Sequence, residues 1–255
     1  MLSGKLMKSR LFFLLPVTLA LLLGACGVNG NAPAAETPLE VLTLQTTPSL
    51  AFKLPEVAEC ANGLPGAGVY TKLLPICDLD PIGADVTIRL GNPLDTDPFV
   101  TVLGTENLVV IAGPDVPVNQ LSLESVQAIF TGDVTDWRNI PEASEMGLTD
   151  ITPITLLSYP QGNDLRSHFA EIYLKSAQLS DVARGFSTSD TLTALLEENP
   201  AAITYALASQ VPPTARILPI RGEEDFSSDI FVIAITPNEP LGPIRSLLLC
   251  LQDAP

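Results

Sequence analysis

Short apolar runs, most of them rich in β-branched residues, alternate along this chain with segments of helical periodicity. Several of the runs are apolar almost throughout, which is typical of strands buried on both faces of a sheet. Strands that alternate with helices predict α/β architecture. The runs that we interpret as strands are "VLTLQ" (41–45), "VTIRL" (86–90), "LVVIA" (108–112), "ITLLS" (154–158), "AITYA" (202–206), "RILPI" (216–220) and "IFVIAI" (230–235).

Helical patterns occupy several of the segments between these runs. The segment "SLESVQAIF" (122–130) predicts a helix with Ser122 as its N-cap, because a side-chain oxygen there can accept from the first turn. The segment 163–179 places apolar residues on one face at helical spacing and begins with Asn163 or Asp164 as the N-cap. Two further helices are predicted over 190–199 and 241–252.

The most apolar stretch of the chain is "LFFLLPVTLALLLGAC", residues 11–26. Lys5, Lys8 and Arg10 precede it and no acidic residue does, which is the order of a signal peptide. Its apolar run of about 15 residues is shorter than the roughly 20 that a helix needs to cross a bilayer. We therefore predict that residues 1–25 are a signal peptide and do not span the membrane permanently.

The predicted signal peptide ends in Leu23, Gly24, Ala25 and Cys26, which resembles the lipobox of bacterial lipoproteins. The resemblance implies cleavage before Cys26, lipidation of its thiol and an extracytoplasmic protein anchored in the membrane by acyl chains. Residues 26–38 are then the lipidated cysteine and a flexible tether, because they are small, polar and broken by proline. The alternative is an ordinary signal peptide followed by a coincidental cysteine.

Charge restricts the partners of the remaining chain. The whole sequence has 13 basic and 29 acidic residues, and the first 25 residues contain three of the bases and none of the acids, which leaves a net charge of −19. Nucleic acids and anionic membrane surfaces require a basic patch, so neither is an expected partner. An anion site in this chain has to be built locally, from helix ends and a few arginines.

The cysteines beyond Cys26 predict one disulfide. Cys60 and Cys77 lie in one turn-rich segment of an exported chain, and we expect them to be joined. Cys250 lies in the apolar helical run "SLLLCLQ" and is predicted to be a buried thiol. The spacing of the cysteines matches no zinc motif, and no metal or cofactor is expected.

Residues for catalysis are scarce. His168 is the single histidine, and because it lies next to Phe169 in a predicted amphipathic helix, a place at the helix surface or core edge is favoured over a catalytic role. The sequence contains no G-x-S-x-G, H-E-x-x-H, P-loop or G-x-G-x-x-G motif. We therefore expect a binding protein and not an enzyme.

The segment "NQLSLESVQAIFTGDVTDWRNI" (119–140) resembles a signature of the phosphate-type periplasmic binding proteins, the substrate-binding components of ABC transporters. In that family a short helix is followed by a phenylalanine, a glycine turn and a buried tryptophan, here Phe130, Gly132 and Trp137. The resemblance extends over about 40–252. It implies a two-lobed type II periplasmic-binding-protein fold with a central cleft. The implied lobes are 39–112 plus 229–255 and 113–228.

The resemblance also identifies candidate ligand-binding residues. Where the family has Ser-Gly-Thr at the start of a second-lobe helix, this chain has Asn163, Asp164 and Leu165, with Arg166 close by. Asp164 would place a carboxylate where an anion is expected, although a helix N terminus also favours aspartate as a simple cap.

The first lobe supplies the other candidates. Thr47 and Ser49 follow the strand 41–45, and their hydroxyl groups can bind a ligand or merely cap a helix. Arg89, Gly91 and Asn92 lie at the end of the strand 86–90, where Arg89 can be a cleft cation or a solvated side chain.

The function implied is a monomeric, lipid-anchored binding protein that delivers a small molecule to an ABC permease. Since the loops are altered, we expect weak binding of phosphate or another oxyanion, and a neutral or zwitterionic solute is also compatible. The alternative is a sensor or adaptor module on the same scaffold, with a decayed anion site and no transport role.

Overall fold

The structure is a computed structural model. The predicted signal peptide (1–25), the lipidation of Cys26 and the tether (26–38) lie outside the residues that it describes. Among the described residues, no helix has the length and apolar character that crossing a membrane requires. The structure describes residues 39–147, 149–150, 152–222 and 227–254.

Within the described residues, nine strands form one mixed sheet. Their order is β2 (Ala67–Leu73), β1 (Glu40–Thr46), β3 (Val86–Leu90), β11 (Asp229–Thr236), β4 (Phe99–Ala112), β8 (Ala202–Leu207), β6 (Thr155–Ser158) and β7 (Arg184–Gly185), with β9 (Arg216–Ile217) beside β4. In its first half, β1 (Glu40–Thr46) lies parallel to both β2 (Ala67–Leu73) and β3 (Val86–Leu90). The next strand, β11 (Asp229–Thr236), is antiparallel to β3. β3 is buried along its whole length, including the polar residues Thr87 and Arg89, as expected of a strand in the interior of a sheet that is covered on both faces.

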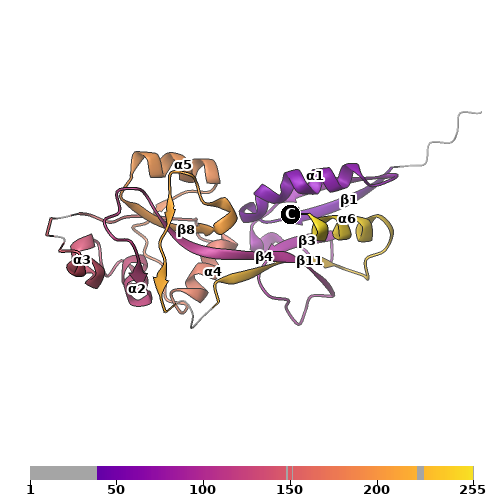
Figure 1. The fold of residues 1–255 in the computed structure, drawn as a ribbon. Helices are drawn as coiled ribbons and strands as arrows, with labels where there is room; N and C mark the ends of the chain where they lie inside the picture. The colour runs from indigo at the N-terminus through magenta and orange to yellow at the C-terminus, as the bar shows by residue number, and fades with distance from the viewer. Residues whose placement is uncertain (1–38, 148, 151, 223–226, 255) are drawn as a thin grey trace, which may run out of the picture. The chain divides into compact units, whose positions relative to one another are not determined.

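The long strand β4 (Phe99–Ala112) runs through both halves of the sheet (Figure 1). Its residues 99–107 pair with β11, whereas 108–112 pair with β8 (Ala202–Leu207). The predicted α/β class is confirmed, although the predicted strand 216–220 is divided between two short strands, β9 and β10. The remaining strands are β5 (Leu121–Ser122), β6 (Thr155–Ser158), β7 (Arg184–Gly185), β9 (Arg216–Ile217) and β10 (Ile220–Arg221).

Two of the predicted helices show how local sequence sets helix ends. Helix α2 (Leu123–Thr131) begins after Ser122, whose Oγ accepts from the Ser125 N–H at 3.2 Å, as predicted. Helix α4 (Asp164–Ile172) is shorter than predicted, and Lys175 beyond it has a positive φ of 51° that a continuing helix does not allow. The other helices are α1 (Leu54–Asn62), α3 (Pro141–Glu145), α5 (Ser189–Glu198) and α6 (Gly242–Asp253).

The core of the second half is aromatic and fixes α4. Phe169 of α4 stacks on Tyr205 of β8 with ring centroids 4.0 Å apart, and it contacts Phe130 of α2 at 4.5 Å. Trp137 is fully buried in the same core, which confirms the buried tryptophan predicted from the sequence. These contacts hold α4 against β8 and thereby determine where its N terminus lies.

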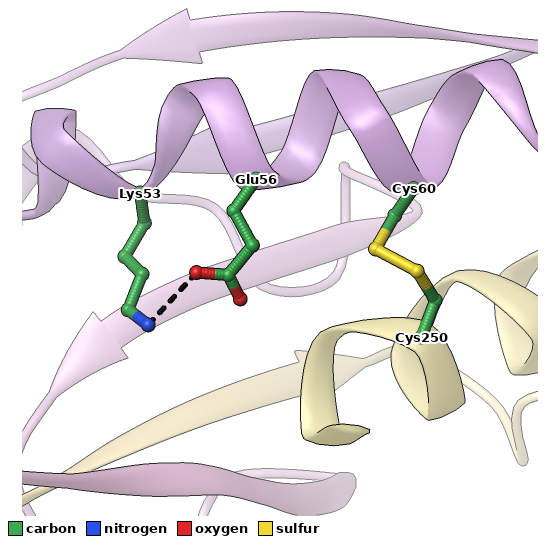
Figure 2. The surroundings of a disulfide bond; sticks show 4 residues. All are labelled: Lys53, Glu56, Cys60 and Cys250. Atoms are coloured by element: carbon green, nitrogen blue, oxygen red, sulfur yellow. Dashed lines mark hydrogen bonds and ion pairs between the residues drawn. A yellow bond between two sulfur atoms is a disulfide. The ribbon is translucent and has the colours of Figure 1, made fainter. Parts of the chain in front are cut away.

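The predicted disulfide between Cys60 and Cys77 is wrong. Cys60 of α1 is bonded to Cys250 of α6, with Cα atoms 5.8 Å apart (Figure 2). Cys77 is exposed and free. The prediction that Cys250 is a buried thiol is therefore also wrong. Strand β2 runs parallel to β1 and, at about 3.3 Å per residue, carries the chain roughly 20 Å away from the end of α1 before it reaches Cys77.

Candidate functional site

Two segments that are far apart in the sequence meet where β1 ends and α4 begins. Thr47 Oγ1 donates a hydrogen bond to Asp164 Oδ2 at 2.6 Å, and Ser49 Oγ donates to Asp164 Oδ1. Ser49 Oγ also contacts Asn163 Oδ1 at 3.3 Å. The structure thus brings together four of the residues predicted to bind a ligand, and it joins them directly to one another.

The Asp164 carboxylate is held on several sides. Its side chain is 1% exposed, and Thr47 is fully buried against it. The Leu165 N–H donates to Asp164 Oδ1 at 3.0 Å, at the positive end of the α4 dipole. Hydroxyl donors and a backbone N–H at a helix N terminus are the surroundings that a bound oxyanion requires. Here the oxyanion is a side chain of the protein itself.

Capping accounts for the neighbouring polar groups. Asn163 is the N-cap of α4, and its Oδ1 accepts from the Leu165 N–H at 3.0 Å and from the Arg166 N–H at 3.3 Å. The Thr47 side chain makes no cap for the 3-10 helix that follows it, Pro48–Lys53. The Thr47 hydroxyl is therefore committed to Asp164 and not to a helix end.

Arg166 turns back toward the end of β6. Its Nη1 donates to the Tyr159 carbonyl at 2.9 Å and contacts Ser158 Oγ at 3.4 Å. Ser158 Oγ in turn lies 2.9 Å from the Tyr205 hydroxyl, and burial raises the pKa of Tyr205 to about 12, so this hydroxyl stays protonated. Within the described chain, Arg166 makes no ion pair with a carboxylate, because its donors are directed at the uncharged oxygens of Ser158 and Tyr159.

Arg89 lies in a different place and is satisfied by its own loop. It is 8% exposed and forms a salt bridge with Asp97 at 2.7 Å. It also donates to the carbonyl groups of Leu90 and Asn92, at 3.1 and 3.0 Å. Asp97 was not identified from the sequence, although an acid soon after a strand-end arginine is the signal that could have found it. Arg89 therefore ties the loop that follows β3.

Gly91 brings that loop against α4. Its φ is +105°, and a Cβ on Gly91 would lie 2.8 Å from His168 Cε1. The Asn92 side chain is exposed. His168 Nδ1 lies 3.9 Å from a Glu171 carboxylate oxygen on the same helix. The predicted binding residues therefore form two groups, one around Asp164 and one around Arg89, and both border α4.

Two cavities draw their lining from both halves of the sheet. The first, of about 320 Å³, is lined by residues that include Ser49, Phe52, Tyr159, Gln210 and the segment 187–190, which leads into α5. Among its described lining residues, Asp190 is the one charged side chain. The second is larger, about 660 Å³, and its lining is mixed in charge. Its lining residues include Arg89, Gly91, Asn92, His168, Glu171 and Asp229.

Comparison with known proteins identifies the fold. No family model and no curated protein sequence matches the chain. The chain is similar to a phosphate ABC transporter substrate-binding protein with bound phosphate from Clostridium perfringens, with a TM-score of 0.68, 18% identity and coverage of 83% of this chain and 93% of that one. It is also similar to an ABC-type phosphate transport receptor from Vibrio cholerae, with a TM-score of 0.65, 11% identity and coverage of 84% and 93%.

The chain has the type II periplasmic-binding fold. The reduced form of the OxyR regulatory domain from Pseudomonas aeruginosa also matches it, with a TM-score of 0.55, 13% identity and coverage of 84% of this chain and 98% of that one. At such low identities these matches establish the two-lobed fold and leave the ligand open.

Within the described residues, no group of three or more histidine, cysteine or acidic side chains lies close enough to hold a metal ion.

Proposed function

We propose that the protein is a lipid-anchored, extracytoplasmic binding protein that delivers a small solute to an ABC permease. The observation that carries this proposal is the cavity of about 320 Å³, which is lined by side chains from both halves of a type II periplasmic-binding fold. A cavity of this size suits a small molecule, and its position lets ligand binding close the two lobes. The structures of phosphate-binding ABC proteins with this fold support a transport role.

The lining of this cavity favours an uncharged or zwitterionic polar solute. Ser49, Ser187 and Gln210 offer hydroxyl and amide groups, and Phe52 and Tyr159 offer aromatic surface. The described lining contains no cationic side chain, so an anion would find no ion-pair partner there. We therefore expect phosphate to bind weakly.

A thermal-shift screen of sugars, amino acids and oxyanions on the purified protein tests this function. A solute that binds should raise the melting temperature, and Gln210→Ala should weaken its binding about tenfold or more, as the loss of one buried hydrogen bond predicts. Gln252→Ala is a matched control, because the amides of Gln210 and Gln252 each donate to a backbone carbonyl and only Gln210 lines the cavity. Equal effects of the two substitutions would show that the solute binds elsewhere.

The lipid anchor has its own test. Because Cys26 stands where a lipobox has its modified cysteine, Cys26→Ser should release the protein from membranes. Detergent partitioning of the variant and the wild type measures this, with Cys77→Ser as the control for loss of a thiol. Equal retention of all three in the detergent phase would contradict the lipoprotein assignment.

The second candidate function is a sensor or adaptor module without a transport role. Two observations favour it: the Asp164 carboxylate already occupies a position suited to an oxyanion, and the OxyR regulatory domain has the same fold. Cross-linking in intact membranes distinguishes the candidates. A solute-binding component should cross-link to a permease, whereas a sensor module should cross-link to a different membrane protein.

A further inference from the structure

We propose that Asp164 is a built-in ligand, whose carboxylate holds the two lobes together by occupying a cradle formed by Thr47 Oγ1, Ser49 Oγ and the Leu165 N–H. This inference goes beyond the proposed function, because such a latch can serve a transport protein or a sensor. It rests on the contacts of Asp164 and not on the identity of any external solute.

The contact joins parts that are each fixed to a different half of the molecule. Thr47 and Ser49 directly follow β1, and Leu50 beside them is fully buried in the core. Asp164 begins α4, which packs on β8 through Phe169. The two halves are linked by the continuous strand β4, so a hinge motion about this link would break the bonds to Asp164.

Because Asp164 is charged and buried, the closed arrangement of the lobes depends on the groups that donate hydrogen bonds to it. The carboxylate is 1% exposed, and among the residues that the structure describes it has no ion-pair partner. Its charge is compensated by the two hydroxyl groups, the Leu165 N–H and the dipole of α4. If these donors are lost, keeping the charge buried costs free energy. Opening the lobes relieves that cost because water then reaches the carboxylate, so loss of the donors should favour the open arrangement.

The same geometry predicts what happens when the carboxylate is removed. Asp164→Ser leaves the two hydroxyl donors and the helix N terminus in place and vacates the position of the two carboxylate oxygens. A small oxyanion from solution can then take this position. Glu124→Ser is the matched control, since Glu124 is an exposed acid in the first turn of α2 and lies outside the cradle.

Calorimetric titration of the full-length protein with inorganic phosphate is the first measurement. We expect Asp164→Ser to bind phosphate at least tenfold more tightly than the wild type, a gain of about 1.4 kcal/mol, and Glu124→Ser to behave as the wild type. Adding Thr47→Val to Asp164→Ser should remove the gain. A folded Asp164→Ser protein that binds phosphate no better than the wild type would overturn the proposal.

The distance between the lobes is the second measurement and does not require Asp164→Ser to fold. Two spin labels report this distance in the full-length protein carrying Cys26→Ser. One is placed on the exposed Cys77 and the other on a cysteine introduced by Val182→Cys in the other half, where the native valine is 77% exposed. We expect the combined change Thr47→Val and Ser49→Ala to lengthen and broaden the distance distribution. An unchanged distribution overturns the latch, whatever solute the wild type binds.

Discussion

Two buried carboxylates of this protein, Asp164 and Glu142, have the same kind of surroundings and different consequences. Glu142 is 3% exposed and accepts from the Ser122 N–H at 2.6 Å and from Ser125 Oγ at 2.7 Å. Asp164 likewise accepts from hydroxyl groups and a backbone N–H. The donors to Glu142 lie 17 to 20 positions away in the same half, whereas the hydroxyl donors to Asp164 lie 115 to 117 positions away in the other half.

The comparison shows that the same kind of hydrogen bonding can connect elements within one half of the molecule or connect the two halves. At Glu142 the carboxylate completes the N terminus of α2 and ties it to α3, so its loss should be a local defect. At Asp164 the same interactions cross between the halves, so their loss should change how the halves are arranged. Stability and lobe separation should therefore respond differently at the two sites.

The largest expected effect comes from the disulfide, which joins α6 to α1, the helix that comes directly after the 3-10 helix Pro48–Lys53. Reducing the Cys60–Cys250 bond releases a loop of 190 residues and should lower the free energy of unfolding by about 5 kcal/mol in the chain-entropy model. Urea denaturation with and without dithiothreitol measures it, and Cys77→Ser is the control. Reducing the disulfide should also loosen α1 and thereby the cradle residues Thr47 and Ser49 that precede it, whereas the hydrogen bonds to Glu142 should stay intact. If Cys77→Ser alone reproduced the loss, the observed pairing would be wrong.

Glu142→Ala should produce the next largest effect. It leaves the Ser122 N–H and the Ser125 hydroxyl without their acceptor, at a cost of about 3 kcal/mol in the free energy of unfolding. The distance between labels on the two lobes should not change, because all of these groups belong to one half. A lengthened distance in Glu142→Ala would remove the contrast with Asp164.

Thr47→Val should cost less, because one hydrogen bond to a carboxylate is lost while the side-chain volume is kept. We expect a loss of about 2 kcal/mol, measured by urea denaturation. Thr46→Val is a close control: Thr46 is the preceding residue, is 3% exposed, and its Oγ1 has no hydrogen-bond partner in the described chain. Thr46→Val should be neutral or slightly stabilising. Equal losses at the two positions would mean that the bond from Thr47 to Asp164 contributes nothing.

Sequence patterns predicted the buried elements well and the exposed ones poorly. The runs of β1, β3, β8 and β11 and residues 108–112 of β4 were recognised because strands buried on the faces of a sheet are rich in apolar residues, whereas the partly exposed residues 99–107 of β4 were missed. Strand β2, "AGVYTKL", was missed because it lies at the edge of the sheet and exposes polar side chains. The lobe boundaries 39–112, 113–228 and 229–255 stay a prediction.

The candidate site depended on contacts that no local pattern reveals. Thr47, Ser49 and Asp164 were each identified as polar residues beside strand or helix ends, but their mutual hydrogen bonds follow from how the halves meet. The partner of Cys60 was missed for the same reason, since nearness in sequence was a poor guide to nearness across α1 and α6. Arg89 was predicted as either a cleft cation or a solvated side chain; it borders the larger cavity and forms a salt bridge with Asp97, which the sequence analysis did not identify.

The smallest expected effect is a pH dependence that isolates Glu142. Burial by itself raises the pKa of this carboxyl, but hydrogen bonds from Ser125 and Ser122 outweigh it and hold the pKa below its ordinary value of 4.5. The stability that Glu142 supplies is therefore complete above pH 4.5 and is lost as the pH falls through the lower pKa of the folded state.

Glu142→Gln cannot titrate, so the difference in free energy of unfolding between it and the wild type should be constant from neutral pH to about pH 5 and should shrink below it. Urea denaturation across this range measures the difference, and other acids cancel because both proteins share them. If the difference for Glu142→Gln stayed constant down to pH 3, the hydrogen bonds from Ser122 and Ser125 would not favour the ionised carboxylate. The comparison of Glu142 with Asp164 as two charged groups held by the same kind of donors would then fail.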